Sequence, residues 1–405
     1  MTTMADNKDK KVLNVPHLRF PEFSGEWEET TLGKISEITK GSGISKDQLS
    51  EQGSPCILYG ELYTKYKSEV IGVVYSRTEL ESSSLVKSKA NDVIIPCSGE
   101  TAIDISTARC VPFNNILLGG DLNIIRLKHD DGGFFAYQLN GARKKDIARV
   151  AQGVSVVHLY GENLKHIRVY HPVIEEQKKI TRLLSLIDER IAIQNKIIEK
   201  LESLIKGLSQ RLLSPKQGWT SYKLDELCQI KSGYSGIQVS FQTAYKVSRI
   251  ETISNHCINM SRIGFVKEIP QEYKLRVGDI LFSNINSVQY IGNTAFIDKD
   301  YGLYHGMNLL RIVPDSRIVF PRFIHLLLCS ERLLRHFQSI CNKAVSQASI
   351  NQTSLGKTIM TIPSYKEQQH ICSIIESVER KLDIETSLLK MLQYQKQYLL
   401  RQMFI

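Results

Sequence analysis

The sequence predicts an α+β fold in which two homologous α/β domains, related by a pseudo-two-fold internal repeat, are separated by an antiparallel coiled coil of two long helices. Three observations predict this fold: a helix start that occurs twice, a framework that recurs around it, and a heptad seam after each copy. PVIEEQKKI at residues 172–180 recurs 191 positions later as PSYKEQQHI at residues 363–371 of the 405-residue chain. This length exceeds one ordinary core, and so long a period indicates two copies of one large unit.

The recurring framework indicates where each copy begins. The pattern W-x4-L-x2-I-x2-I-x2-G at residues 27–41 recurs at residues 219–233, with leucine replacing the first isoleucine. NDVII at 91–95 recurs as GDILF at 278–282, and NIIRL at 123–127 as NLLRI at 308–312, so the offset varies between 192 and 185. We therefore expect a polar N-terminal tail at 1–14, globular domains at 15–173 and 215–364, and helices at 174–214 and 365–405.

Each globular domain combines short β-rich runs with a helical stretch. The runs are at residues 92–96, 123–127, 280–284 and 309–313, and Gly, Ser and Asn loops separate them. Residues 134–149 and 323–342 carry apolar residues at spacings of three to four, which is typical of an amphipathic helix. Each domain should therefore be mixed α/β.

The long helices carry apolar residues at alternating spacings of three and four. The first begins with two glutamates, which suit the positive end of the helix dipole. The narrow seam is typical of a coiled coil rather than of a surface helix with a wider apolar face. The second domain follows the first helix almost at once, which favours an antiparallel pair. Packing of each helix on its own domain alone stays an alternative. The seam positions are Leu184, Ile187, Ile191, Gln194, Ile198, Leu201, Ile205, Leu208 and Leu212, then Ile375, Val378, Leu382, Glu385, Leu389, Leu392, Lys396, Leu399 and Met403.

Composition favours a polyanionic partner. The chain has 52 Lys and Arg against 42 Asp and Glu, a net charge of +10, which is compatible with nucleic-acid binding. The eight cysteines include no CxxC pair, so we expect buried or incidental thiols in a reducing cytoplasm rather than a zinc or redox site. No run of about 18 apolar residues is present, and the first residues do not resemble a secretory signal.

The common catalytic motifs are missing from the sequence. Gly356-Lys357-Thr358 resembles the end of a phosphate-binding loop, but Asn351 stands where that loop needs its first glycine. GxSxG, HExxH, the dinucleotide-binding glycine pattern and the motif with which amino-methyltransferases hold their target amine are not found. We therefore expect no catalytic residue and no metal ligand in this chain.

Loops rich in Ser, Asn, Gln, Lys and Tyr occupy equivalent places in the two domains. They are KGSGISK at 40–46, IPCSGE at 95–100 and AQGVSVVH at 151–158, then KSGYSG at 231–236, SNINSV at 283–288 and NKAVSQASIN at 342–351. Such side chains can bind phosphates and base edges, although ordinary solvated loops remain the alternative for each residue. The candidate DNA-binding residues in these loops are Lys40, Ser42, Ser45, Lys46, Ser98, Glu100, Gln152, Ser155, His158, Lys231, Ser232, Tyr234, Ser235, Asn284, Asn286, Ser287, Asn342, Lys343, Ser346, Gln347 and Ser349.

Several stretches together resemble the specificity subunit of a type I restriction–modification enzyme. They are NVPHLRFPEF at 14–23, the W-x4-L-G-x-I module, YGELYTKY at 59–66, SRIETI at 248–253, the paired P-x3-EQ helix starts and QMFI at 402–405. The tandem duplication with paired heptad helices is the most specific element. The resemblance covers nearly the whole chain after residue 13 and adds Tyr59, Tyr63 and Arg249 to the candidate DNA-binding residues.

This resemblance implies a non-catalytic DNA-recognition subunit with two target recognition domains. Each domain would bind one half of a bipartite, asymmetric sequence in double-stranded DNA, and the helices would set the gap and dock two modification subunits. Those partners would bind S-adenosylmethionine and methylate adenine, restriction subunits would add cleavage, and this chain would bind no cofactor. Two alternatives remain: a stand-alone DNA methyltransferase or nuclease with degenerate motifs, and a coiled-coil scaffold that binds no DNA.

Overall fold

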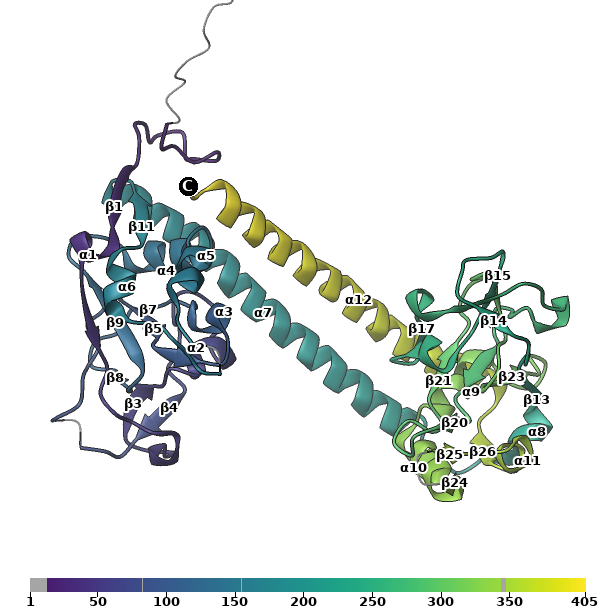
Figure 1. The fold of residues 1–405 in the computed structure, drawn as a ribbon. Coiled ribbons are helices and arrows are strands. Elements are labelled where there is room, and N and C mark those ends of the chain that lie inside the picture. Colours follow the sequence, from purple (N-terminus) through teal and green to yellow (C-terminus); the bar gives the residue numbers. More distant parts are fainter. Residues whose placement is uncertain (1–12, 82, 154, 344–346) are drawn as a thin grey trace, which may run out of the picture. The chain divides into compact units, whose positions relative to one another are not determined.

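The structure, a computed structural model, describes residues 13–81, 83–153, 155–343 and 347–405. Of the expected polar tail, only residues 13 and 14 lie within this range. The chain forms two compact units (Figure 1): unit 1 holds the residues up to Lys196 with Thr386–Ile405, and unit 2 holds Ile197–Glu385. Each unit therefore contains one globular domain and one half of each long helix.

The globular domain of unit 1 is built on a four-stranded antiparallel sheet. Its strand order is β2-β9-β5-β7, formed by Ser36–Lys40, Leu122–Leu127, Asp92–Pro96 and Arg109–Val111. All five residues of β5 are buried, as expected for a central strand. Helix α4 (Gly132–Asn140) contacts β5 and β7 and contributes Phe134 and Phe135 to the core.

Shorter elements complete unit 1 and bring its loops together. Strands β4, β3 and β8 form a second sheet, β1 pairs with β11, and β6 pairs with β10. These short elements are β1 Glu28–Thr31, α1 Leu32–Ile35, η1 Lys46–Gln48, β3 Ser54–Ile57, α2 Glu61–Thr64, β4 Ser76–Thr78, β6 Ser98–Gly99, α3 Ala102–Ile105, β8 Leu117–Leu118, α5 Lys144–Val150, β10 Val157–His158, α6 Gly161–Lys165 and β11 Arg168–His171.

Unit 2 repeats this plan. Its main sheet has the order β13-β23-β19-β21, formed by Cys228–Ser232, Leu310–Pro314, Ile280–Phe282 and Thr294–Phe296. A second sheet has the order β14-β18-β15-β22, β12 pairs with β26, β16 with β17, and β20, β25 and β24 form a small third sheet. The other elements are β12 Thr220–Lys223, α8 Leu224–Leu227, β14 Gln238–Val239, β15 Tyr245–Val247, η2 Ile250–Thr252, β16 Ile253–Ser254, β17 Cys257–Ile258, η3 Met260–Arg262, β18 Gly264–Val266, η4 Gln271–Tyr273, β20 Ile285–Asn286, β22 Leu303–Tyr304, α9 Pro321–Leu328, α10 Glu331–Ile340, β24 Asn342–Lys343, β25 Ala348–Ser349, α11 Gln352–Gly356 and β26 Ile359–Ile362.

Strand pairing confirms the internal repeat but corrects one of its offsets. Val93 pairs with Ile125 in unit 1 and Ile280 with Ile312 in unit 2, so β9 and β23 are equivalent at an offset of 187 residues. The offset of 185 expected for NIIRL and NLLRI is therefore wrong by two residues. The shared arginine is misleading. Arg126 forms an ion pair with Asp92 and Arg311 with the equivalent Asp279, but the two arginines stand at positions of the repeat that differ by two residues.

Each expected helical stretch proves to be two helices. In the first domain the chain turns at Gly141 between α4 and α5. In the second, Ser330 caps α10 after α9 has ended, and its hydroxyl accepts a hydrogen bond from the backbone N–H of Leu333. Both breaks let the second helix turn away, and neither is visible in the apolar spacing.

The repeated helix starts contain a glutamine with the same structural role in both copies. The Gln177 side chain donates to the carbonyl of Pro172 at 2.9 Å and accepts from the backbone N–H of Asp131 at 2.9 Å. Gln368 likewise donates to the carbonyl of Pro363 at 3.0 Å and accepts from the N–H of Phe320 at 2.8 Å. Asp131 and Phe320 are the N-caps of α4 and α9. Each glutamine thus joins the start of a long helix to the start of a domain helix.

Each long helix begins after one globular domain and ends in the core of the unit that holds the other domain. Helix α7 runs from Ile174 to Leu212 and α12 from Tyr365 to Gln402. After α12, Phe404 packs edge-on against Trp27 in the core of unit 1, with ring centroids 6.3 Å apart. After α7, Leu213 is buried in the core of unit 2. Leu184 and Ile187 of α7 share the core of unit 1 with Leu399 and Met403 of α12. The first part of α7 therefore packs with the last part of α12, which is the expected antiparallel arrangement.

The seam positions are buried or half-buried in both helices. Among the polar ones, Gln194 and Glu385 are 2% and 7% exposed, and Lys396 lies between two carboxylates. Its Nζ is 2.5 Å from Glu69 Oε2 of the first domain and 2.6 Å from Asp188 Oδ1 of α7. Helix α12 therefore contacts more than its own domain, which excludes the alternative of helices that pack only locally.

Candidate nucleic-acid interface

Two of the candidate loops in the first domain meet through a pair of two-residue strands. β6 pairs with β10, so that Ser98 lies opposite His158. The backbone groups of Gln152 and His158 also exchange two hydrogen bonds, of 2.9 and 2.7 Å. The loops at 95–100 and 151–158 thereby form one surface, on which Glu100, Gln152, Ser155 and His158 are exposed.

The third loop joins them through a turn that sequence reasoning missed. The N–H of Ser42 donates to the carbonyl of Leu118 at 3.0 Å, and a Cβ on Gly41 would lie only 2.0 Å from the carbonyl oxygen of Gly119. On the same turn, Asp121 accepts from the N–H of Cys97 at 2.6 Å and from the Ser98 hydroxyl at 3.2 Å. The signal that could have revealed this turn is GGD, since Asp121 has a φ of 57°, a conformation that Asp and Asn adopt more readily than most residues.

Aromatic side chains surround this loop cluster. The Tyr63 hydroxyl lies beside the loop at 95–100, since a Cβ on Gly99 would be 3.8 Å from it, and burial raises the pKa of Tyr63. The His158 ring stacks on Tyr160 with centroids 6.2 Å apart and an interplanar angle of 22°. Tyr160 is 47% exposed and was not among the predicted residues. Exposed aromatic faces of this kind can stack on nucleobases.

The remaining candidates in this domain have different surroundings. Lys40 is exposed at the end of β2, and Ser45 and Lys46 are exposed where the 3-10 helix η1 begins. Ser42 is half-buried, and its hydroxyl accepts from the backbone N–H of Val86 at 2.8 Å. The hydroxyls of Ser42 and Ser98 therefore bond to other parts of the protein and hold the loops in place.

The second domain gathers its loops in the same way. β20 pairs with β25, so that Asn286 lies opposite Ala348, and the Asn284 side chain donates to the carbonyl of Ile350 at 3.3 Å. Asn286 accepts from the backbone N–H of Ser287 at 2.8 Å. Asn342, Lys343 and Gln347 are exposed, Ser349 is half-buried, and Ser346 lies outside the described residues.

The loop at 231–236 repeats the contact between two glycines. A Cβ on Gly233 would lie 1.8 Å from the carbonyl oxygen of Gly306, and the N–H of Tyr234 donates to the carbonyl of His305 at 3.0 Å. Asn308 follows with a φ of 63°, as Asp121 does in the first domain. Lys231, Ser232 and Ser235 are exposed and Tyr234 is half-buried. Equivalent loops thus meet in both domains while their side chains differ.

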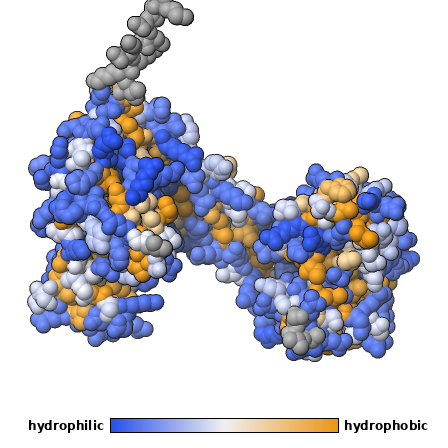
Figure 2. All heavy atoms as spheres, in the orientation of Figure 1, coloured by the Kyte–Doolittle hydropathy of each residue, from blue (hydrophilic) through white to orange (hydrophobic). Residues whose placement is uncertain are grey.

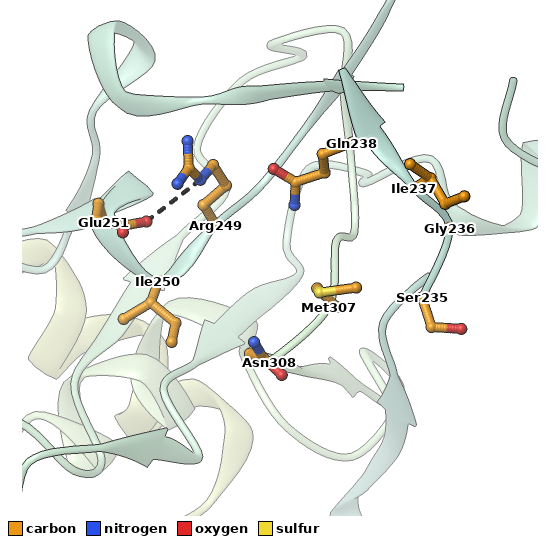
Figure 3. A pocket seen from close by; sticks show the side chains of 9 residues that line it. All are labelled: Ser235, Gly236, Ile237, Gln238, Arg249, Ile250, Glu251, Met307 and Asn308. Atoms are coloured by element: carbon orange, nitrogen blue, oxygen red, sulfur yellow. Dashed lines mark ion pairs between the residues drawn. The ribbon is translucent and has the colours of Figure 1, made fainter. Parts of the chain in front are cut away.

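A pocket of about 410 Å³ opens beside this loop (Figure 3). Arg249 lines it and forms an ion pair with Glu251, with Nε 3.4 Å from Oε2. Gln238 and Asn308 supply amide groups that can donate and accept hydrogen bonds. Nearby, burial lowers the pKa of His305 to about 4, so its ring is neutral at pH 7 while Nε2 lies 2.9 Å from the carbonyl of Leu309.

The chemistry of these clusters is that of a recognition surface. Amides, hydroxyls, cationic side chains and aromatic rings can bind phosphates and base edges. Within the described ranges, no group of three or more His, Cys, Asp or Glu side chains is arranged to hold a metal ion. No helix of the described chain is long and apolar enough to cross a membrane.

Comparison with known proteins agrees with this geometry. The model of the type I restriction modification DNA specificity domain matches the chain twice, at residues 24–203 and 216–394. The type I restriction enzyme MjaVIII specificity subunit of Methanocaldococcus jannaschii is 21% identical over 416 residues, covering 93% of this chain and 91% of the relative. The HindI specificity subunit of Haemophilus influenzae is 29% identical over 154 residues, covering 37% of this chain and 32% of the relative.

A solved structure shares the fold over nearly the whole chain. The S subunit of a type I restriction–modification system from M. genitalium has a TM-score of 0.64 at 17% identity, covering 96% of this chain and 99% of that one. The chain belongs to the family of type I restriction–modification DNA specificity domain proteins. Its two tandem domains and these relatives identify its function as that of a specificity subunit and favour it over a stand-alone methyltransferase, a nuclease or a scaffold without a DNA role.

Proposed function

We propose that this chain is the non-catalytic DNA-recognition subunit of a cytoplasmic type I restriction–modification complex. Each globular domain would bind one half of a bipartite, asymmetric target in double-stranded DNA. The observation that carries this proposal is the pair of equivalent loop clusters, which rest on one repeated framework but present different side chains. Equivalent positions with different chemistry are suited to the recognition of two different short sequences.

The long helices offer surfaces for partner subunits. Outside the seam, α12 exposes Ile384, Met391, Tyr394 and Tyr398, which are 58% to 78% accessible. Helix α7 exposes Leu186, Ile193 and Leu204. Figure 2 shows hydrophobic residues at the surface among mainly hydrophilic ones. Large apolar and aromatic side chains exposed on a helix are typical of binding interfaces, and we expect two modification subunits to dock there.

In this proposal the subunits of the complex have different tasks. The modification subunits would bind S-adenosylmethionine and methylate adenine, restriction subunits would add translocation and cleavage, and this chain would supply sequence choice. Phosphate contacts from exposed lysines and arginines would position the complex, and loop side chains would discriminate between bases. The helices would set the number of unrecognised base pairs between the half-sites.

The test is a comparison of the chain alone with the chain plus its modification subunits. Purified chain should transfer no methyl groups from S-adenosylmethionine to DNA, whereas the complex should methylate adenines in one bipartite sequence that sequencing of the product can map. Methyl transfer by the chain alone would contradict the proposal, as would methylation by the complex without any sequence preference.

The spacer role has its own test. Insertion of one heptad into both long helices, at matched positions, should lengthen the gap and leave both half-sites unchanged. A complex of this variant that methylates the original gap length would contradict the role proposed for the helices.

A further inference from the structure

The pocket beside Arg249 has the features of a base-recognition site. Arg249 follows β15, Gln238 lies on β14 and Gly264 on β18, and these three strands pair in one sheet. The backbone N–H of Arg249 donates to the Thr252 hydroxyl at 2.8 Å, and this hydroxyl donates to the carbonyl of Arg262 at 2.9 Å. Because Thr252 is completely buried, the main chain under Arg249 is fixed while its side chain, 46% exposed, faces solvent.

The partner of Arg249 favours contact with a base over contact with a phosphate. Glu251 lies beside Nε, with Oε2 3.4 Å from it, and one terminal nitrogen of the guanidinium points away from Glu251 (Figure 3). A carboxylate at this distance repels a phosphate, since both carry negative charge. Guanine presents two neighbouring acceptors, O6 and N7, that match the planar arginine fork, and a carboxylate can accept a hydrogen bond from the N4 amino group of cytosine.

A glycine makes room for this arrangement. A Cβ on Gly264 would lie 2.7 Å from Gln238 Oε1 and 3.1 Å from Arg249 Cδ. Any larger residue would therefore displace both side chains. In Figure 3 the amide of Gln238 points toward Arg249, whereas Ser235 and Ile237 point away from it.

The first domain has no counterpart of this arginine. The backbone N–H of Leu58 donates to the Glu61 side chain at 3.0 Å, as that of Arg249 does to Thr252. Leu58 therefore occupies the equivalent position, and it is buried. The chemistry around Arg249 thus belongs to one domain and should affect one half-site only.

We propose that Arg249, oriented by Glu251 and given room by Gly264, recognises the guanine of a G·C base pair in the half-site bound by the second domain. This inference rests on the proposed function of the chain. A bidentate contact of arginine with guanine discriminates against other bases by about 5- to 150-fold. Arg249 is thus a specificity-determining residue.

The experiment measures binding and methylation by the complex with modification subunits, on duplexes in which each base pair of both half-sites is replaced in turn. Arg249→Ala should reduce discrimination by about 5- to 150-fold at one G·C pair of the second half-site and leave all other positions unchanged. Gly264→Ala keeps every charge and should weaken discrimination at the same base pair. The matched control is Arg317→Ala. Asn308 of the pocket precedes β23, whereas Arg317 follows the C-terminal end of this strand, where it forms an ion pair with Asp315.

Two outcomes would overturn the inference. A uniform loss of affinity across all sequences, with the slope of log K against log salt reduced by about 0.9, would identify Arg249 as a phosphate contact. Unchanged discrimination at every position would exclude any role in recognition. Failure of the proposed function itself would give a different result, because the complex that contains the chain without substitutions would then show no sequence preference at all.

Discussion

Lys396 should be a main stabilising contact between α12 and the rest of unit 1. It is 13% exposed and lies within 2.6 Å of carboxylate oxygens of both Glu69 and Asp188, which are 9% and 7% exposed. Burial, followed by the charge of Glu69, raises the pKa of Asp188 to about 6 despite the ammonium group. Burial opposes ionisation of Glu69 too, but Lys396 lowers its pKa below the usual value. The Lys396→Met variant would leave two neighbouring buried carboxylates without this cation.

Loss of one partner of a buried ion pair costs about 3–5 kcal/mol, far more than loss of an exposed pair. The chain has two tryptophans, and only Trp27 belongs to unit 1. In a Trp219→Phe background, denaturant unfolding followed by Trp27 fluorescence therefore reports on unit 1. We expect Lys396→Met to lower its free energy of unfolding by about 3–5 kcal/mol at pH 8.

Two controls make this prediction specific. Lys165→Met removes an exposed ion pair with Glu162 in the same unit and should cost about 0.5 kcal/mol or less. The loss caused by Lys396→Met should shrink at pH 5, because Asp188 then takes up a proton, which removes one of the two charges that the variant leaves without a cation. Equal losses for both lysine variants, or a loss that is the same at pH 5 and pH 8, would refute the reasoning.

Three further predictions concern the helix starts, pH and the loops. Gln177→Ala should destabilise unit 1 by about 2–4 kcal/mol and Gln368→Ala should do the same in unit 2, since each leaves buried backbone groups unsatisfied. The control is Gln369→Ala, because Gln369 is exposed. Equal effects of the three substitutions would contradict the role of the two buried glutamines in joining the helix starts. The hydrogen bond that His171 donates to the Asp130 carboxylate raises the pKa of His171, so its stabilising contribution should be complete below about pH 6.5 and lost as the pH rises through the raised value. His171→Gln should abolish this slope of stability against pH, and an unchanged slope would exclude the assignment. Gly41→Ala should weaken recognition of the first half-site, because its Cβ would meet the Gly119 carbonyl oxygen at 2.0 Å. Gly43→Ala is the control, because a Cβ on Gly43 would meet nothing within 4 Å. Equal effects of the two substitutions on DNA binding would contradict this prediction.

Local patterns in the sequence account for much of the framework. The heptad seam is a property of one helix at a time, so its period predicted α7 and α12 directly. The strand at 92–96 matches β5, because a buried central strand is a continuous apolar run. The breaks at Gly141 and Ser330 were missed because apolar spacing continues across them.

Contacts between distant residues account for what the sequence could not predict. Lys396 was expected as a polar seam residue of uncertain role, because its partner Glu69 lies 327 residues away. The paired strands β6 and β10 have two residues each, too few for any periodicity to be recognised. Asp121 and Asn308 adopt left-handed backbone conformations beside the loops, and only the turn residues around them carry a signal. Which of the loop residues contact bases stays a prediction.

Exchange of one domain tests the central claim most directly. Residues 15–173 would be replaced by the corresponding domain of another member of the family, and methylated adenines would be mapped by sequencing DNA treated with the complex. We predict that one half-site changes completely while the other half-site remains the same. A change in both half-sites, or in neither, would contradict the account of two independent recognition domains on a repeated framework.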